Sequence, residues 1–156
     1  MIGYVGLAEA NHLVLRPASF ADAEYLLYLR NDRETRRQSI QQGRVTRAQH
    51  ARWLRKTLAS GDSLLFVVQH GGVDIGSARL DCKIKACEMT LTIEPARRGE
   101  GFMGPLIEAI KAEATRRGYS LLRTQVRQNN VRSLRGFLGA GFLPTSDELM
   151  ILEATL

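Results

Sequence analysis

The chain has little of what marks several classes of protein. Its 156 residues include only two cysteines, and Cys82 and Cys87 have neither metal-site spacing nor a disulfide framework around them, so we expect buried free thiols and no metal site. No apolar run approaches the roughly 20 residues that a membrane-spanning helix needs. Residues 1–10 lack the basic start of a signal peptide, which favours a cytoplasmic protein that does not act at a membrane.

Nothing in the sequence divides it, because it has no internal repeat, low-complexity tract or linker. We therefore expect one domain over residues 1–156, with 1–11 as an N-terminal extension. The net charge of +6 is concentrated in residues 30–58, which hold nine Lys or Arg against two acids. This segment would attract a phosphate-bearing partner, or it is simply a solvated, arginine-rich helical surface.

Hydrophobic periodicity and turn residues predict a mixed α/β chain. Gly71-Gly72 joins two strand-like runs and suits a tight hairpin turn. Ser19 with Asp22 resembles a capping box before the first helix. The expected order is a strand at 12–16, a helix ending near 30, a short second helix, a helix from 46, strands at 63–70, 73–81 and 87–93, a helix at 105–117, a strand at 121–126, a helix after 130 and one or two last strands.

The stretch from Ile93 to Gly104, IEPARRGEGFMG, joins a strand to a helix through a glycine-rich turn. Such a turn forms an anion site, because backbone N–H groups without intrahelical partners converge there with the positive end of the helix dipole. Arg97 and Arg98 add full charges. The spacing matches neither a P-loop nor a Rossmann turn, and a turn that only connects the two elements would look similar.

Two motifs resemble those of the GCN5-related N-acetyltransferases, the GNAT family. The segment from Arg98 to Phe102 resembles the family's diphosphate-binding signature, although the family usually has Gly or Ala where this chain has Met103. NNVRSLRGFLGAGF resembles the closing signature NxxSxxxYxxxGF. The resemblance runs from His12 onward and implies a single α/β (α+β) domain with a mixed, mostly antiparallel sheet of six to seven strands flanked by about four helices.

The resemblance also implies an enzyme that uses acetyl-coenzyme A. In this fold the strand beginning at Cys87 splays from the next parallel strand, and the pantetheine arm of the cofactor lies in the gap. Asn130 would contact that arm, or it is a helix N-cap. The residues implied to bind the cofactor are Leu91, Thr92, Ile93, Arg98, Gly99, Glu100, Gly101, Phe102, Met103, Gly104, Asn130, Ser133 and Phe137.

Acetyl transfer to an amine requires a group that accepts the amine's proton. Glu88 resembles the family's general base, and an ordinary exposed strand glutamate is the alternative. His50 is a second candidate base, although a solvated helix histidine fits the pattern better. The tyrosine that usually protonates the departing thiolate corresponds to Phe137, so water or Ser133 would donate that proton. Phe137→Tyr should then leave activity unchanged or raise it.

The N-terminal strings LRPASFADAEYLLYLRND and QHARWL resemble those of acetyltransferases of nucleotide-linked amino sugars and of ribosomal-protein N-termini. Arg30, Asn31, His50 and Trp53 are therefore the candidate substrate residues, and Trp53 could equally belong to the core. We expect a small, anionic amine substrate such as a nucleotide-linked amino sugar. The alternatives are a protein N-terminus and, in another class, a non-catalytic domain that binds nucleic acid, which the lack of interleaved aromatics disfavours. A homodimer is left open.

Overall fold

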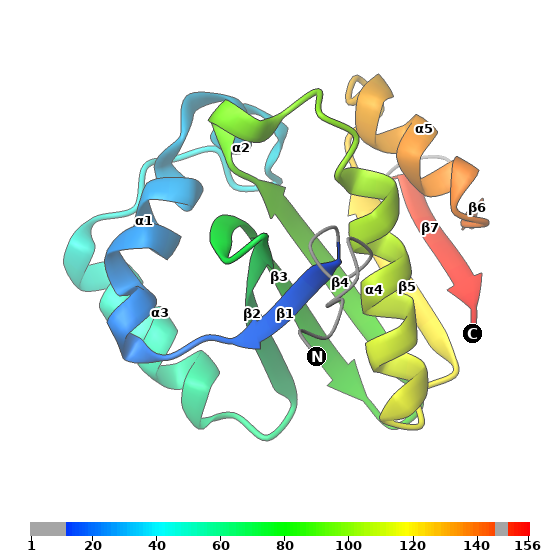
Figure 1. Cartoon of the computed structure of the whole chain (residues 1–156), viewed down its shortest axis with the longest axis horizontal. Coiled ribbons are helices and arrows are strands. Elements are labelled where there is room, and N and C mark those ends of the chain that lie inside the picture. The colour runs from blue at the N-terminus through cyan, green and yellow to red at the C-terminus, as the bar shows by residue number, and fades with distance from the viewer. Residues whose placement is uncertain (1–11, 146–149) are drawn as a thin grey trace, which may run out of the picture.

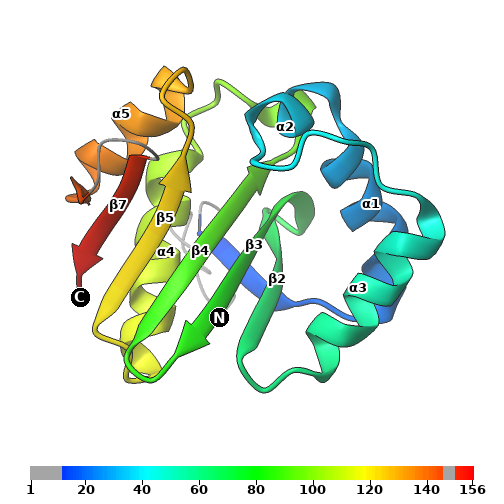
Figure 2. The same ribbon diagram turned by 180° about the vertical axis from the view of Figure 1, so that it is seen from behind.

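The computed structural model describes residues 12–145 and 150–156, which form one mixed sheet with helices on both faces (Figures 1 and 2). The strand order is β1-β2-β3-β4-β5-β7-β6, and every neighbouring pair is antiparallel except β4 and β5. The strands are β1 (Leu13–Pro17), β2 (Ser63–His70), β3 (Val73–Lys83), β4 (Ala86–Ile93), β5 (Leu121–Val126), β6 (Leu143–Pro144) and β7 (Met150–Thr155). The predicted mixed, mostly antiparallel sheet is confirmed.

The described residues form five helices rather than about four. They are α1 (Ala23–Asn31), α2 (Arg33–Gln38), α3 (Arg47–Ala59), α4 (Met103–Arg116) and α5 (Val131–Gly139). Helix α4 begins two residues before Pro105, so the proline is the third helical residue and not the first. Side-chain caps set two of the other starts: Ser19 caps the short 3₁₀ turn that leads into α1, and Thr46 caps α3 through a capping box.

Alternation along the strands divides the apolar residues between two cores. Helices α4 and α5 cover one face, where the large core includes Phe66, Leu80, Met89, Ile110 and Phe142. A smaller cluster of Leu26, Leu54, Leu65 and Val67 lies on the other face under α1 and α3. Those two helices reach only the β1–β3 side, so β4, β5 and β7 present their second face without a helix in front of it (Figure 2). We call this surface the open face.

The one parallel pair of strands separates part-way along its length. Pairing between β4 and β5 runs from Ala86↔Leu121 to Glu88↔Arg123, although β4 continues to Ile93 and β5 to Val126. The expected gap between these strands therefore opens directly after Glu88. Helix α4 follows the end of β4 and α5 follows the end of β5, so both helices begin beside the gap (Figure 1).

The expectation of free thiols is wrong. Cys82 and Cys87 are directly opposed in the β3–β4 register, with their Cα atoms 4.0 Å apart, and they form a disulfide. Both are buried under α4 in the large core. Sequence spacing alone gave no reason to pair them, because they are five positions apart and only the hairpin register brings their side chains together.

Candidate active site

The edge of β4 that faces the gap carries main-chain groups without a neighbouring strand. The amide of Glu94 donates to Ile75 on β3, whereas the carbonyl of Met89 points the opposite way and accepts from Thr124 on β5. Because successive residues of a strand point to opposite sides, Leu91 and Ile93 direct their main-chain groups into the gap and Thr92 directs its groups toward β3. Of the predicted stretch 91–93, Leu91 and Ile93 therefore offer hydrogen bonds to an extended ligand arm.

The glycine turn after β4 fits a diphosphate. Gly99 and Gly101 have positive φ values of 81° and 84°, which favour glycine and turn successive amides in one direction. A Cβ atom added at Gly99, Gly101 or Gly104 would meet nothing within 4 Å, so the space in front of these residues is open to a ligand. The amides of Met103 and Gly104 open helix α4 and add the positive end of its dipole. The residues present therefore fit the diphosphate end of coenzyme A.

The arginine that begins this turn points inward. The Arg98 guanidinium donates through Nε to the carbonyl of Ile93, through Nη2 to the Thr35 hydroxyl, and lies with Nη1 3.0 Å from the Asp32 carboxylate. Its side chain thus joins the turn to the start of α2, and its charge is paired. Arg97 is paired in turn with Glu100 at 2.6 Å and lies over the Phe102 ring.

Glu88 stands on the open face at the point where the strands part. Its neighbours in register are Asp81 on β3 and Arg123 on β5, so a row of polar residues crosses the sheet here. Asp81 accepts from Ser63 and lies 2.8 Å from Nε of Arg79, and Arg123 is paired with Glu153. Glu88 is exposed between these paired groups, so an ammonium group can approach its carboxylate from solvent.

The candidate acid Ser133 lies on α5, together with two other predicted cofactor residues at its start and further along it. Asn130 caps this helix, accepting from the amide of Ser133 at 3.3 Å, as its alternative role predicted. Ser133 is half-buried on the first turn. Phe137 is 4% exposed and packs its ring edge-on against Phe142 with centroids 5.2 Å apart, so it belongs to the core beside the gap.

Two of the substrate candidates hold a loop in place. The amide group of Asn31 donates to the carbonyl of Val45 and accepts from the Val45 amide, which occupies both ends of the side chain. Arg30 donates to the carbonyl of Gln41. The Arg30-Asn31 pair therefore fixes the loop at 39–45 between α2 and α3, and Asn31 could bind a substrate only by releasing Val45.

The remaining two candidates lie together on α3. His50 is 4% exposed, so it is not the solvated helix histidine that the sequence suggested. Burial and the nearby Arg30 guanidinium lower the pKa of His50, which keeps the ring neutral. Trp53 lies 5.1 Å from it, packs partly on the small core, and carries the Arg79 guanidinium 5.6 Å above its ring. Trp53 and Arg79 together border the open face.

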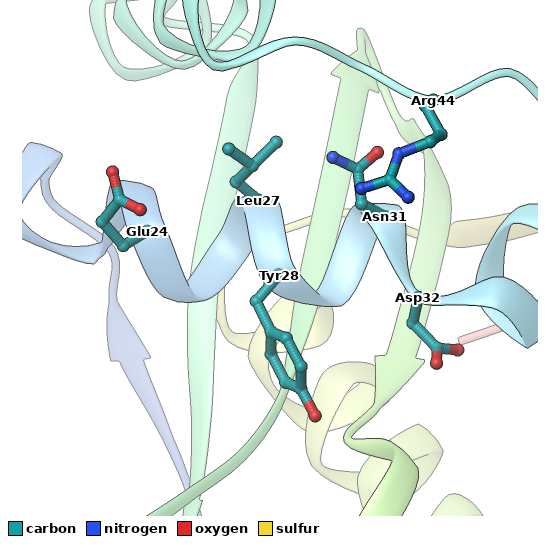
Figure 3. Close-up of a pocket in the computed structure, with 6 residues that line it drawn as sticks. All are labelled: Glu24, Leu27, Tyr28, Asn31, Asp32 and Arg44. Atoms are coloured by element: carbon teal, nitrogen blue, oxygen red, sulfur yellow. The ribbon is translucent and has the colours of Figure 1, made fainter.

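A separate pocket of about 330 Å³ lies along α1 (Figure 3). Its lining carries charges of both signs and comprises Glu24, Leu27, Tyr28, Asn31, Asp32 and Arg44. Tyr28 extends from one side of the helix, whereas Leu27 and Asn31 extend from the other side, where Arg44 lies beside Asn31 (Figure 3). The pocket borders α1 rather than the β4–β5 gap.

A family model for the acetyltransferase (GNAT) domain matches residues 12–143. The chain belongs to the GNAT family. It is therefore an N-acetyltransferase that uses acetyl-coenzyme A, and this excludes the non-catalytic nucleic-acid-binding domain considered as an alternative. The matched range includes the glycine turn and the two parallel strands that separate beside it. No match was found among curated proteins.

Solved structures of other acetyltransferases share this GNAT fold. The chain is similar to a spermidine N-acetyltransferase from Vibrio cholerae in complex with coenzyme A and spermine, at 17% identity and a TM-score of 0.87 over 92% of this chain and 95% of that one. It is similar to an acetyltransferase from Salmonella typhimurium with acetyl-coenzyme A, at 20% identity and a TM-score of 0.76 over 93% and 94%. It is also similar to an aminoglycoside acetyltransferase in complex with coenzyme A, at 16% identity and a TM-score of 0.80 over 92% of this chain and 94% of that one.

The sequence did not single out the groups that surround Glu88 in this GNAT domain. Asp81, Arg79 and Arg123 occupy polar positions of strands whose alternate residues are buried, so alternation placed them on the open face. Only the register showed that Asp81 and Arg123 flank Glu88. Among the residues that the structure describes, no helix is long and apolar enough to cross a membrane, and no cluster of acidic, histidine or cysteine side chains could hold a metal ion.

Proposed function

We propose that this acetyltransferase transfers an acetyl group to the primary amine of a nucleotide-linked amino sugar. The observation that carries the proposal is the position of Glu88, an exposed carboxylate on the open face at the point where β4 and β5 part. Acetyl-coenzyme A supplies the acetyl group as a thioester, and over the whole reaction the substrate ammonium loses two protons, one of which ends on the thiol.

The cofactor would be held by groups of two kinds. The amides of residues 99–104 would bind the diphosphate, and the main-chain groups of Leu91 and Ile93 would pair with the pantetheine arm. The Ile93 carbonyl already accepts from Arg98, which leaves its amide to the ligand. An arm that lies along β4 brings its thiol end toward Glu88, because the gap narrows from Ile93 down to the Glu88↔Arg123 pair.

Glu88 is the proposed base. Its carboxylate would bind the ammonium of the acceptor and remove the first proton, directly or through one water, which leaves the nitrogen lone pair free to attack. The two groups that flank it are both paired, Asp81 with Arg79 and Arg123 with Glu153, so the Arg123 charge does not repel the ammonium. Phe137 has no proton to give, so the Ser133 hydroxyl or water would protonate the departing sulfur.

The acceptor would lie across the open face between Glu88 and α3. The Trp53 ring, with the Arg79 guanidinium stacked over it, offers a flat border suited to a sugar or base. Arg33, Arg44 and Arg52 of the basic segment are exposed and add a positive field that would attract phosphate. Two of the similar structures are named for enzymes that acetylate polycations, namely spermidine and aminoglycosides. The phosphate of a nucleotide-linked amino sugar, which the basic segment would attract, distinguishes the proposed substrate from those polycations.

The experiment has two stages. Calorimetry with acetyl-coenzyme A first tests the cofactor site, and a thiol-release screen then compares a nucleotide-linked amino sugar, the free amino sugar, spermidine, an aminoglycoside and a peptide N-terminus. We expect turnover on the nucleotide-linked amino sugar and its loss on the free sugar. Preference for the peptide would move the assignment to a protein N-terminal acetyltransferase, and preference for spermidine or the aminoglycoside would exclude the anionic substrate.

A further inference from the structure

Met103 occupies the position at which the GNAT signature usually has a small residue. It is the first residue of α4, its side chain is half-buried, and it packs against the large core. Its far end reaches α5: a Cβ atom added at Gly136 would lie 2.7 Å from Sδ, 2.9 Å from Cε and 3.3 Å from Cγ of Met103. The thioether of Met103 therefore lies in the space that any other residue at position 136 would fill.

Gly136 is explained by this contact. It stands inside α5, where a glycine costs about 1 kcal/mol relative to alanine. Its φ is not positive, so the backbone at this position does not require glycine. Gly139 on the same helix differs, because a Cβ atom there would meet nothing within 4 Å. The methionine at 103, where the family usually has a small residue, and the glycine at 136 therefore depend on each other, because the Met103 side chain fills the space beside Gly136.

The Met103 thioether lies beside the route between the two ends of the cofactor site. The diphosphate would be held at the N-terminus of α4, and the gap that takes the pantetheine arm lies between β4 and β5, where α5 begins. An arm that runs from one to the other passes the first turns of α4 and α5. Met103 joins the first turn of α4 to Gly136 in the middle of α5, with the core beneath it.

We propose that Met103 forms the apolar wall against which the pantetheine arm lies, and that Gly136 keeps the thioether withdrawn so that the passage stays open. This inference rests on the proposed cofactor site. Where the family usually has a small residue, this chain has a long, flexible side chain that packs against a second helix.

The test is Gly136→Ala, with Gly139→Ala as the matched control. The atoms that an alanine at 136 would meet are the end of a flexible side chain, so Met103 moves rather than the backbone, and the helix gains propensity. We expect the melting temperature to fall little or to rise. The displaced thioether should raise the Kd for coenzyme A about three- to tenfold, with the Kd for adenosine 3′,5′-bisphosphate, which lacks the arm, unchanged.

Met103→Ala is the second variant, since it adds no bulk. It should weaken coenzyme A binding through loss of the wall, and Met103→Ala/Gly136→Ala should bind no more weakly than Met103→Ala. Equal binding of coenzyme A by the Gly136→Ala and Gly139→Ala variants would overturn the inference, as would equal losses for coenzyme A and the bisphosphate. Absence of coenzyme A binding by the unaltered protein would instead contradict the cofactor site itself.

Discussion

The guanidinium of Arg98 lies 3.0 Å from the carboxylate of Asp32, and this ion pair joins the diphosphate turn to the first turn of α2. Both side chains are mostly buried, at 24% and 18% exposure. Burial alone would raise the pKa of Asp32, but the Thr35 amide and the Arg98 guanidinium outweigh it and hold this pKa below its usual value. The glycine turn is thereby fixed to helix α2.

Asp32→Asn should weaken the connection between the glycine turn and helix α2. The amide still caps α2 but leaves the Arg98 charge unpaired, so we expect a loss of about 1–2 kcal/mol in the free energy of unfolding and weaker coenzyme A binding. Because the folded pKa is lowered, the carboxylate stabilises the fold fully above pH of about 4, and this advantage disappears as the pH falls through the folded pKa. Urea titrations over pH check this, with Glu34→Gln on the exposed side of α2 as control. Equal loss in both variants would contradict it.

Glu88→Gln should lower kcat by about 10²- to 10⁴-fold, because the amide cannot accept the ammonium proton. Coenzyme A binding should be unchanged, since Glu88 faces the open side of the sheet and lies outside the diphosphate turn. Glu108→Gln, an exposed position on α4, is the control. Steady-state rates across pH, together with calorimetry, test the assignment. A near-normal rate at every pH would show that Glu88 is not the base.

His50 should make the fold sensitive to mild acid. Burial, followed by the Arg30 charge, lowers its folded pKa, so the unfolded chain binds a proton more readily. Stability should be full above the unfolded value of about 6.5 and should fall as the pH drops from there toward the folded pKa. His50→Gln should remove this part of the pH dependence, whereas exposed His12→Asn should retain it. Denaturation midpoints at two pH values measure the difference.

Phe137 has a packing role that the sequence did not reveal. Phe137→Ala removes a ring that is 4% exposed and packs against Phe142. This truncation should lower the free energy of unfolding by about 3–5 kcal/mol. Phe137→Tyr should leave the rate unchanged or raise it, because its hydroxyl would stand where the family places its acid. A large loss of activity in a variant that unfolds normally would show that the added hydroxyl blocks the gap.

Patterns local in sequence predicted most of the fold. The Gly71-Gly72 turn and the capping box of Ser19 and Asp22 each depend on neighbours within a few positions. The element order and the separation of β4 from β5 followed from these and from the family resemblance. Helix α4 begins at Met103 and not at the expected Pro105. Proline is also tolerated as the third residue of a helix, because the N–H group that it lacks would have no intrahelical partner there.

The partners of the long polar side chains could not be predicted in this way. Asn31 hydrogen-bonds to the main chain of Val45, and Arg98 pairs with Asp32 and donates to Thr35, because tertiary packing brings those groups within reach. His50 is buried because α3 turns it toward Trp53 and α1. The predicted cofactor residues lie around the β4–β5 gap. Of the substrate candidates, Arg30 and Asn31 instead hold the loop at 39–45 and His50 is buried. The roles of all these residues remain predictions.

The early end of the β4–β5 pairing has a consequence for solvent exchange. An amide that donates to a neighbouring strand is protected from deuterium, whereas one that faces an open slot is labelled within moments. Leu91 and Ile93 should therefore take up the label sooner than Thr92 between them, in an every-other-residue pattern along a single strand. Saturating coenzyme A should erase that pattern, so the label would report occupancy residue by residue without any acceptor present.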